Sequence, residues 1–376
     1  EEKEKYINLF NDILSEKRHI LYIAHHRLKR SPGQRFRFEL FINFLQKNGY
    51  KIKHSFLLSE KDDRIFYSKG NYLGKASILL KSFFKRWKSV NQAHKFDAVI
   101  VYREAYMLGT LLFEKILKRK NKNVIYDFDD AIWIRDVSEG NVAVKWLKTP
   151  SKTANIITMS RFVLAGNQYL ADYARKLNKN TIVFPTVIDT NYHTPSTNHE
   201  KSSICIGWTG SSTTLKHFFI AIPVLKKIKD KYGSKVRFKV IVDADYKNEE
   251  LEIVSCKWNI DTEIKDLQDI DIGIMPLPDD DWSKGKCGFK GLQYMALEIP
   301  AIMSPVGVNT ELIKDGENGY LANNQDEWFS KISTLIDSKE KRVQMGKKGK
   351  ILVEEKYSLK AHQNNLLKII NSLIEN

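Results

Sequence analysis

Short apolar runs alternate with amphipathic stretches from one end of the chain to the other. Apolar runs of strand length lie at 19–24, 50–58, 97–102, 123–126, 156–160, 162–166, 181–184, 204–208, 236–242, 251–255, 272–277 and 301–304. Between most of them, apolar residues recur at helical spacing. The clearest expected helices lie at 38–48, 75–90, 168–176, 218–228, 289–297, 326–337, 341–356 and 359–374. Strands that alternate with helices predict an α/β fold with parallel, doubly wound sheets.

A polar, turn-rich stretch at 189–203 (DTNYHTPSTNHEKSS) divides this pattern. The charge balance changes there too, because residues 1–200 hold 35 Lys and Arg against 20 Asp and Glu, whereas 201–376 hold 26 against 25. A chain of 376 residues also exceeds the usual size of a single core. We therefore expect a domain at 1–190, a second at 204–355, and a last segment at 356–376 whose helix packs back onto the first.

Composition restricts the function. The net charge of +16 favours a polyanionic partner or an anionic lipid surface, and no nucleic-acid-binding signature accompanies it. Three scattered cysteines predict a reduced, cytoplasmic protein without a structural zinc site. No apolar run approaches the ~20 residues of a membrane span, and the first residues do not form a signal peptide.

The expected helix at 75–90 is basic and amphipathic. The predicted apolar face consists of Ala76, Leu79, Leu80, Phe83, Trp87 and Val90. Lysines and an arginine lie off that face, which is typical of a helix that binds a membrane interface. The alternative is that the face packs on its own sheet, as most amphipathic helices do.

Charged residues follow two predicted strands of the N-terminal half. They are Arg103, Glu104, Asp127, Asp129 and Asp130. Residues just beyond parallel strands face the ligand-binding edge, and burying carboxylates without purpose is costly. Arg35 and Arg37 open a helix after a Pro-Gly break, where the helix dipole disfavours cations, so they indicate a partner anion or a solvated pair.

Two loops of the C-terminal half have the character of phosphate sites. The first, GWTGSSTTLKHF at 207–218, offers Gly210 and Ser211 before a helix that carries Lys216. The second follows the strand at 272–277 and places Lys286, Gly288 and Lys290 at the start of the helix at 289–297. Trp258 lies in a loop, where it either stacks on a flat base or is a half-buried structural side chain.

The stretch GIMPLPDDDWSKGKCGFKGLQYMALEIPAIMSPVGVNTELIKDGENGYLA, at 273–322, resembles the donor region of family-4 glycosyltransferases. SPGQRFRFE, YDFDDAIW, AGNQYLADYA and GWTGSSTTLKHF match that family more weakly. The resemblance implies the GT-B fold, which has two Rossmann-like domains and an interdomain cleft. It implies a nucleotide sugar held by the C-terminal domain, an acceptor held by the N-terminal one, and retention of anomeric configuration without an obligatory metal.

Carried over by position, the resemblance assigns roles to residues of this chain. Lys216 and Lys290 would balance the donor diphosphate. Backbone amides at 285–289, which include Phe289, would face the sugar, and Gln293 would face the ribose. Asp127 would lie near the reacting sugar. The family's usual pair of glutamates is replaced by Gly285 and Gln293, and its arginine before Lys216 is absent.

The sequence therefore predicts a glycosyltransferase that uses a UDP-sugar, or else a GDP-sugar, in polysaccharide or glycolipid assembly. The acceptor would be a saccharide or a lipid-linked saccharide, met at the inner face of the membrane. Asp127, Asp129 or Asp130 would orient its hydroxyl, with Arg35, Arg103 and Glu104 on the acceptor side. Two alternatives remain: a metal-dependent transferase that uses Asp127-Phe128-Asp129 as a D-x-D motif, and a non-catalytic partner subunit of the same fold.

Overall fold

The computed structural model describes residues 18–68, 70–134, 151–196 and 202–375. The chain divides into two units, one formed by residues 1–185 and 363–376 and the other by residues 186–362. The predicted linker at 189–203 includes residues 197–201, which lie outside the described ranges.

The first unit is built on a six-stranded parallel sheet of order β2-β1-β3-β4-β5-β6. Its strands are β1 (Arg18–Ile23), β2 (Tyr50–Ser55), β3 (Ala98–Tyr102), β4 (Val124–Phe128), β5 (Phe162–Ala165) and β6 (Thr181–Val183). Its helices are α2 (Pro32–Arg37), α3 (Ile42–Lys47), α4 (Glu60–Phe66), α5 (Tyr72–Asn91), α6 (Leu112–Lys120), α7 (Ser151–Met159) and α8 (Gln168–Arg175). The strands β3 and β4 are buried along their whole length, as expected of a sheet covered on both faces.

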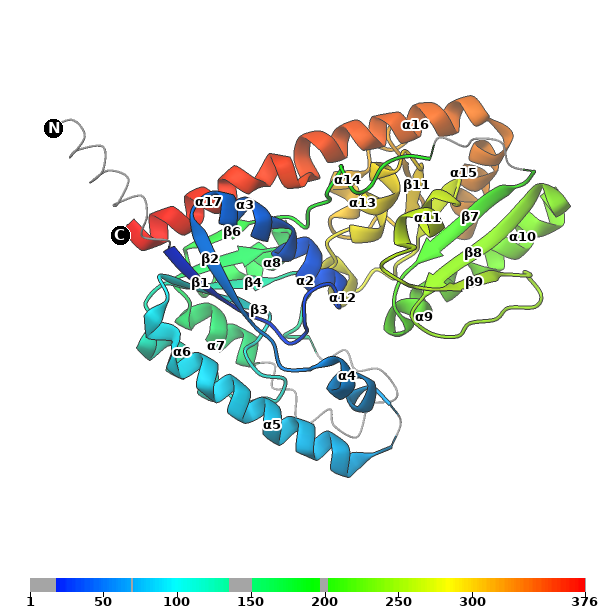
Figure 1. Cartoon of the computed structure of the whole chain (residues 1–376). Coiled ribbons are helices and arrows are strands. Elements are labelled where there is room, and N and C mark those ends of the chain that lie inside the picture. Colours follow the sequence, from blue (N-terminus) through cyan, green and yellow to red (C-terminus); the bar gives the residue numbers. More distant parts are fainter. Residues whose placement is uncertain (1–17, 69, 135–150, 197–201, 376) are drawn as a thin grey trace, which may run out of the picture. The chain divides into compact units, whose positions relative to one another are not determined.

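Helices α5 and α6 cover one face of this sheet (Figure 1). Their inward residues pack with β1 and β3 in a core that includes Ile78, Val90, Phe113, Leu117 and Val99. Arg86 is completely buried among them. Its guanidinium donates to the backbone oxygens of Ala24 (2.7 Å) and Ser55 (3.0 Å), at the carboxyl ends of β1 and β2. Arg86 therefore fixes which side of α5 faces the sheet.

The second unit has a six-stranded parallel sheet of order β12-β11-β10-β7-β8-β9. Its strands are β7 (Ile204–Thr209), β8 (Val236–Val242), β9 (Val254–Lys257), β10 (Ile272–Met275), β11 (Ala301–Met303) and β12 (Tyr320–Leu321). Its helices are α9 (Leu215–Phe218), α10 (Ile222–Tyr232), α11 (Glu263–Gln268), α12 (Asp281–Lys284), α13 (Phe289–Ala296), α14 (Asn309–Leu312), α15 (Gln325–Asp337) and α16 (Lys339–Leu352). The predicted α/β, doubly wound fold class is confirmed in both units.

Glycines allow α13 to approach its strands and α16 to approach the turn after α13. A β-carbon on Gly273 of β10 would lie 2.3 Å from the Tyr294 ring, and one on Gly346 of α16 would lie 1.9 Å from the backbone oxygen of Glu298. Glu298 itself adopts a positive φ of 59°, a conformation that costs a non-glycine residue energy. An ion pair of 3.1 Å to Lys350 of α16 holds it there. The packing of α16 against Glu298 therefore fixes the carboxyl end of α13, and with it the position of the whole helix.

Helix α17 (Leu359–Glu375) begins in the second unit, and its residues from Gln363 onward belong to the first. In the first unit, Asn371 accepts hydrogen bonds from Arg18 and Tyr50, and Glu375 pairs with Arg18. Among the described residues, no helix has both the length and the hydropathy needed to cross a membrane.

Three expectations about secondary structure are wrong. The strand expected at 156–160 is absent, since residues 156–159 lie in helix α7; a short apolar run does not distinguish the strand period from the helix period. The helix expected at 218–228 is interrupted, since α9 ends at Phe218, a 3-10 turn follows, and α10 begins at Ile222 with Pro223 in its first turn.

The third wrong expectation concerns α5, because the residues of its predicted apolar face do not share one environment. Val90 is buried, and Leu79 and Phe83 are half-buried, whereas Ala76, Leu80 and Trp87 are exposed. The inward stripe of α5 includes Ser82 and Arg86, so it is more polar than the helical spacing of apolar residues indicated.

The approach of α16 to Glu298 gives a stability prediction. We expect Gly346→Ala to lower the free energy of unfolding by about 2–3 kcal/mol, because a backbone oxygen cannot move away from the added methyl group without shifting the chain. Gln344→Ala, at an exposed position of the same helix, should change it by less than about 0.5 kcal/mol. Chemical denaturation measures both, and equal values for the two variants would contradict the packing described.

Candidate functional site

In the second unit, three predicted lysines act electrostatically on one buried histidine. His217 of α9 is 4% exposed. Burial, together with the charges of Lys290, Lys286 and Lys216, lowers the pKa of His217 to about 4, while Asp280 opposes the shift. The imidazole is therefore neutral near pH 7 while three cations lie within electrostatic reach of it. We refer to His217 with these lysines as the lysine cluster.

Aromatic rings support two of these lysines. Lys290 Nζ lies 5.4 Å from the ring centroid of Trp208, the buried tryptophan of β7, and Lys286 Nζ lies 4.8 Å from that of Trp282. Contacts of this kind stabilise an ammonium group without neutralising it. A β-carbon on Gly210 would lie 2.3 Å from the Trp208 ring, so only glycine fits beside the tryptophan.

The loops around the cluster are held by their own polar groups. Gly288 precedes α13 with a φ of 66° and has no side chain that could cap the helix. Before it, Asp280 caps α12 by accepting from the backbone N–H of Ser283 at 2.7 Å. On the other loop, Ser211 and Thr214 form a reciprocal capping box. Ser211 therefore caps the 3-10 turn that precedes α9.

Gln293 and Trp258 meet in a buried polar network that also contains His193 and Glu263. The amide of Gln293 donates to Glu263 Oε1 (3.3 Å) and contacts His193 Nε2 (3.4 Å), while Trp258 Nε1 donates to the same carboxylate at 3.3 Å. His193 Nδ1 lies 3.1 Å from the Asp189 carbonyl oxygen. Because a carbonyl only accepts, the proton is on Nδ1 and Nε2 can accept from Gln293. Glu263 thus places a carboxylate beside Gln293.

In the first unit, the acidic cluster (Asp127, Asp129 and Asp130) lies at the carboxyl end of β4. Asp127 is 2% exposed and pairs with Arg37 of α2, whose Nε lies 3.1 Å from Oδ1. Burial raises the pKa of Asp127, and the Arg37 charge opposes this shift. Arg37 also donates to the backbone oxygen of Phe184. The expectation that Arg35 and Arg37 open a helix is wrong, because both lie in the last turn of α2, where the helix dipole favours cations. The anion that Arg37 binds is a carboxylate of the same unit.

The other two carboxylates hold Arg103. Arg103 Nε donates to Asp129 Oδ1 at 2.8 Å, and its NH2 group donates to Asp130. The hydroxyl of Tyr102 also donates to Asp129, at 2.9 Å. Arg103 adopts a φ of 61°, in a three-residue turn that the N–H of Glu104 closes on the Tyr102 oxygen at 2.8 Å. This positive-φ γ-turn is strained, and such strain accumulates at functional sites.

The remaining acceptor-side candidates lie close by in the chain, with other contacts. Glu104 pairs with the buried Lys152 at 2.8 Å. Arg35 is 7% exposed, and its guanidinium carbon lies 4.5 Å from the centroid of the Phe36 ring. Gly33 brings the start of α2 against the acidic cluster, since a β-carbon there would lie 2.0 Å from the Tyr102 hydroxyl and 2.9 Å from Asp129 Oδ2.

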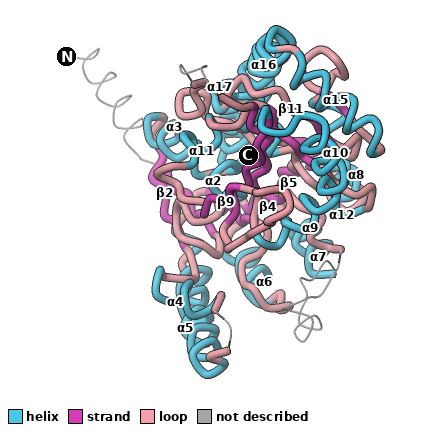
Figure 2. Tube along the Cα trace, turned by 90° about the vertical axis from the view of Figure 1, so that its right-hand side faces the viewer, coloured by secondary structure: helices cyan, strands magenta, loops and turns pink. Residues whose placement is uncertain are grey.

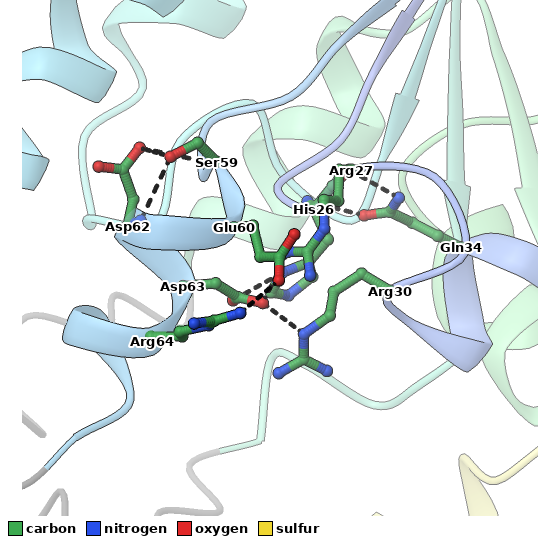
Figure 3. Close-up of polar contacts among 9 residues, drawn as sticks. All are labelled: His26, Arg27, Arg30, Gln34, Ser59, Glu60, Asp62, Asp63 and Arg64. Atoms are coloured by element: carbon green, nitrogen blue, oxygen red, sulfur yellow. Dashed lines mark hydrogen bonds and ion pairs between the residues drawn. The ribbon is translucent and has the colours of Figure 1, made fainter. Parts of the chain in front are cut away.

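The basic loop between β1 and α2 is organised by Asp63 of α4, as Figure 3 shows. Asp63 accepts from Arg27 at 2.9 Å and from Arg30 at 2.5 Å. Gln34 of α2 binds both the N–H and the carbonyl of His26, at 2.9 and 3.0 Å. These bonds hold the loop between β1 and α2 against helix α4 and against the start of α2.

Sequence reasoning missed several of these side chains. His217, His193, Glu263 and Tyr102 were not singled out, and only the position of Arg37 gave a signal. Tyr102, His193 and Glu263 were overlooked because they bond to residues distant in sequence. His217 adjoins Lys216 and was overlooked because its burial has no local signal. Among the described residues, no group of three or more His, Cys, Asp and Glu side chains could hold a metal ion.

Comparison with known proteins adds family information to this geometry. Residues 203–338 match the family model "Glycosyl transferases group 1". Spore coat protein SA of Bacillus subtilis (strain 168) is 33% identical over 80 residues, which are 20% of this chain and 21% of that protein. The chain thus spans about a fifth of the length of this relative.

Solved structures share the fold over nearly the whole chain. The sucrose-phosphate synthase of Thermosynechococcus elongatus superposes with a TM-score of 0.71 at 11% identity, covering 95% of this chain and 99% of that one. Anabaena Alr3699/HepE, in complex with UDP and glucose, gives a TM-score of 0.63 at 13% identity and covers 94% and 100%. Residues 203–338 therefore match the group 1 glycosyltransferase family, and nearly the whole chain shares the GT-B fold of these solved structures.

Proposed function

We propose that the protein is a glycosyltransferase that takes a sugar from a UDP-sugar, or else a GDP-sugar, and that the lysine cluster receives the diphosphate. The observation that carries the proposal is that Lys216, Lys286 and Lys290 all act on the buried His217, with Lys286 and Lys290 held over the rings of Trp282 and Trp208. Phosphate oxygens placed there would interact favourably with these positive charges. HepE, a structural relative, binds UDP-glucose, which supports uridine as the base.

The chemistry follows from where negative charge grows during transfer. As the bond from the sugar to the diphosphate breaks, charge accumulates on the departing phosphate oxygens. Lysines that are already positioned stabilise that charge without reorganising, and the first turn of α13 adds its dipole. Phe289 and the backbone at 285–289 would contact the sugar. The Gln293–Glu263 pair would supply the polar contacts to the ribose that a glutamate makes elsewhere in the family.

On the acceptor side, we assign different roles to the three carboxylates. Asp127 is neutralised by Arg37 and would act by positioning α2. Asp129 and Asp130 would hold Arg103, whose half-buried guanidinium is suited to an anionic group on the acceptor. Arg35 and Glu104 would complete this side. Transfer would proceed with retention, so the acceptor hydroxyl attacks the face of the sugar that the diphosphate leaves.

The acceptor would be a saccharide or a lipid-linked saccharide of a cell-surface polysaccharide or glycolipid. The basic N-terminal half, with 35 Lys and Arg against 20 Asp and Glu over residues 1–200, supports peripheral contact with the anionic inner face of a membrane. No metal or other cofactor would be needed, because the lysines take the place of a divalent cation at the diphosphate.

The donor proposal is tested by nucleotide binding. Lys290→Ala and Lys216→Ala should each raise the Kd of UDP about tenfold or more, since each removes a charge-assisted contact to phosphate. Lys227→Ala, at an exposed position of α10, serves as the matched control and should leave the Kd unchanged. Isothermal titration calorimetry gives the three values. If both cluster variants bound UDP as tightly as the control, the cluster would not be the diphosphate site.

Chelation separates this mechanism from the D-x-D alternative. Asp127 and Asp129 are already bonded to Arg37 and Arg103, so we expect the rate of donor hydrolysis or transfer to be unchanged in excess EDTA. A rate that collapses in EDTA and returns with Mg²⁺ or Mn²⁺ would favour the metal-dependent transferase.

The positioning role of Arg37 predicts a large effect on stability. Arg37→Met should lower the free energy of unfolding by about 3–5 kcal/mol, because it leaves the Asp127 carboxylate buried without its charge partner. Arg64→Met breaks the exposed pair with Glu60 in the same unit and should cost less than about 1 kcal/mol. Adding Asp127→Asn to Arg37→Met should recover part of the loss. Denaturant titration of the four proteins measures these differences, and no recovery in the double variant would argue against the pairing.

A further inference from the structure

Helix α5 presents a continuous apolar stripe to solvent. Leu73, Leu80, Phe84 and Trp87 are 89%, 61%, 62% and 44% exposed, and Ala76 is exposed between them. The spacing of three, four, four and three residues keeps all five on one side of the helix. Single exposed apolar residues are ordinary, whereas a row of them along four turns marks an interaction surface.

The outward direction of this stripe is fixed from inside the unit. The opposite side of α5 is buried at Ile78, Ser82, Arg86 and Val90, and the hydrogen bonds of Arg86 tie it to the ends of β1 and β2. Lys81 pairs with Asp62 of α4 at 3.0 Å, and both views show α4 and α5 side by side (Figures 1 and 2). The helix cannot rotate to cover its apolar side chains without breaking these bonds.

Positive charge lies beside the stripe. Helix α5 contains no Asp or Glu, and its exposed Lys88 lies on a side next to the stripe, as does Lys81, whose side chain is 63% exposed although it pairs with Asp62. The last turn of α6, Lys118 to Lys120, is basic and exposed. Asn121, directly after it, donates to the backbone oxygens of Ala93 and Phe96 at 3.0 and 2.6 Å, so this basic turn ends near the carboxyl end of α5.

We propose that the stripe and its flanking cations dock the protein on an anionic lipid bilayer surface, with the apolar side chains inserted among the headgroups. This inference rests on the proposed function in one respect, since it names the surface through which a membrane-bound acceptor is met. An amphipathic helix with a basic flank and with Trp and Phe on its apolar side is suited to that interface. A second copy of the chain is a poorer occupant, because a symmetric contact would bring the lysines of both copies together.

Vesicle flotation without nucleotide tests the proposal on the whole protein. We expect binding to vesicles of phosphatidylcholine with phosphatidylglycerol, weaker binding to phosphatidylcholine alone, and release by salt. The triple variant Leu80→Ser/Phe84→Ser/Trp87→Ser should bind at least about tenfold more weakly. Its matched control replaces three exposed apolar residues elsewhere, Leu177→Ser/Val343→Ser/Ile351→Ser, and should bind as the unmodified protein does.

Charge is tested separately with a second pair of variants. Lys81→Gln/Lys88→Gln should weaken binding by about fivefold or more, since each lysine near an anionic surface contributes on the order of 1 kcal/mol. Lys347→Gln/Lys348→Gln, at exposed positions of α16, should have no effect. The proposal is overturned if the unmodified protein does not float, if the stripe variant floats as well as its control, or if phosphatidylcholine alone binds equally well. It is also overturned if the stripe variant dissociates a dimer of the protein in lipid-free buffer.

The two proposals can fail independently. Donor hydrolysis, measured without vesicles, tests the transferase chemistry, and the stripe variant should retain it because none of its residues contacts the lysine cluster or the acidic cluster. Flotation without hydrolysis would keep the docking surface and reject the proposed reaction, and hydrolysis without flotation would do the reverse.

Discussion

Backbone groups at the carboxyl ends of parallel strands need partners once helices cover the sheet, and in the first unit two buried arginines provide them. Arg86 donates to the oxygens of Ala24 and Ser55, and Arg37 donates to the oxygen of Phe184 while pairing with Asp127. Each arginine reaches from a helix to the edge at which the strands end. Because a buried guanidinium is stable only when its donors are bonded, these contacts determine where α2 and α5 lie and which of their sides face inward.

Two features of the first unit depend on this constraint. Arg37 holds α2 beside the acidic cluster, where Gly33 lets the chain approach Tyr102 and Asp129. Asp129 is then bonded to Arg103, which remains in its strained turn because Asp130 and the Asp127 carbonyl also bind it. On the other side of the sheet, Arg86 faces inward, so the residues half a turn away, from Leu73 to Trp87, must face solvent. The geometry of the acidic cluster and the outward direction of the stripe therefore both depend on arginines that bond to the ends of the strands.

Sequence patterns predicted the parts of the fold in which neighbours along the chain determine the outcome. The strand at 236–242 and the start of α13 at Phe289 were predicted at their observed positions, because an apolar run and a Gly-rich turn are local signals. The lysines of the cluster were also predicted as candidates, since they lie in loops that follow predicted parallel strands. Partnerships between distant residues were not: Arg37 and Asp127 are 90 residues apart, and His193 and Gln293 are 100 apart. The stripe on α5 was misassigned because spacing gives the sides of a helix but not which of them faces the sheet.

The replacements at Gly285 and Gln293 acquire a physical meaning from this arrangement. The family resemblance places carboxylates at both positions, and their loss removes two negative charges from the neighbourhood of three lysines. Glu263 places one carboxylate beside Gln293. Among the contacts described, no carboxylate takes the corresponding place beside Gly285. Lys216, Lys286 and Lys290 bring positive charge to the loops around His217, and a diphosphate bound there would interact favourably with it. A ligand that binds only the folded state stabilises it by an amount that grows with the logarithm of its concentration relative to Kd. Binding of the proposed donor would therefore be linked to the folding of the second unit.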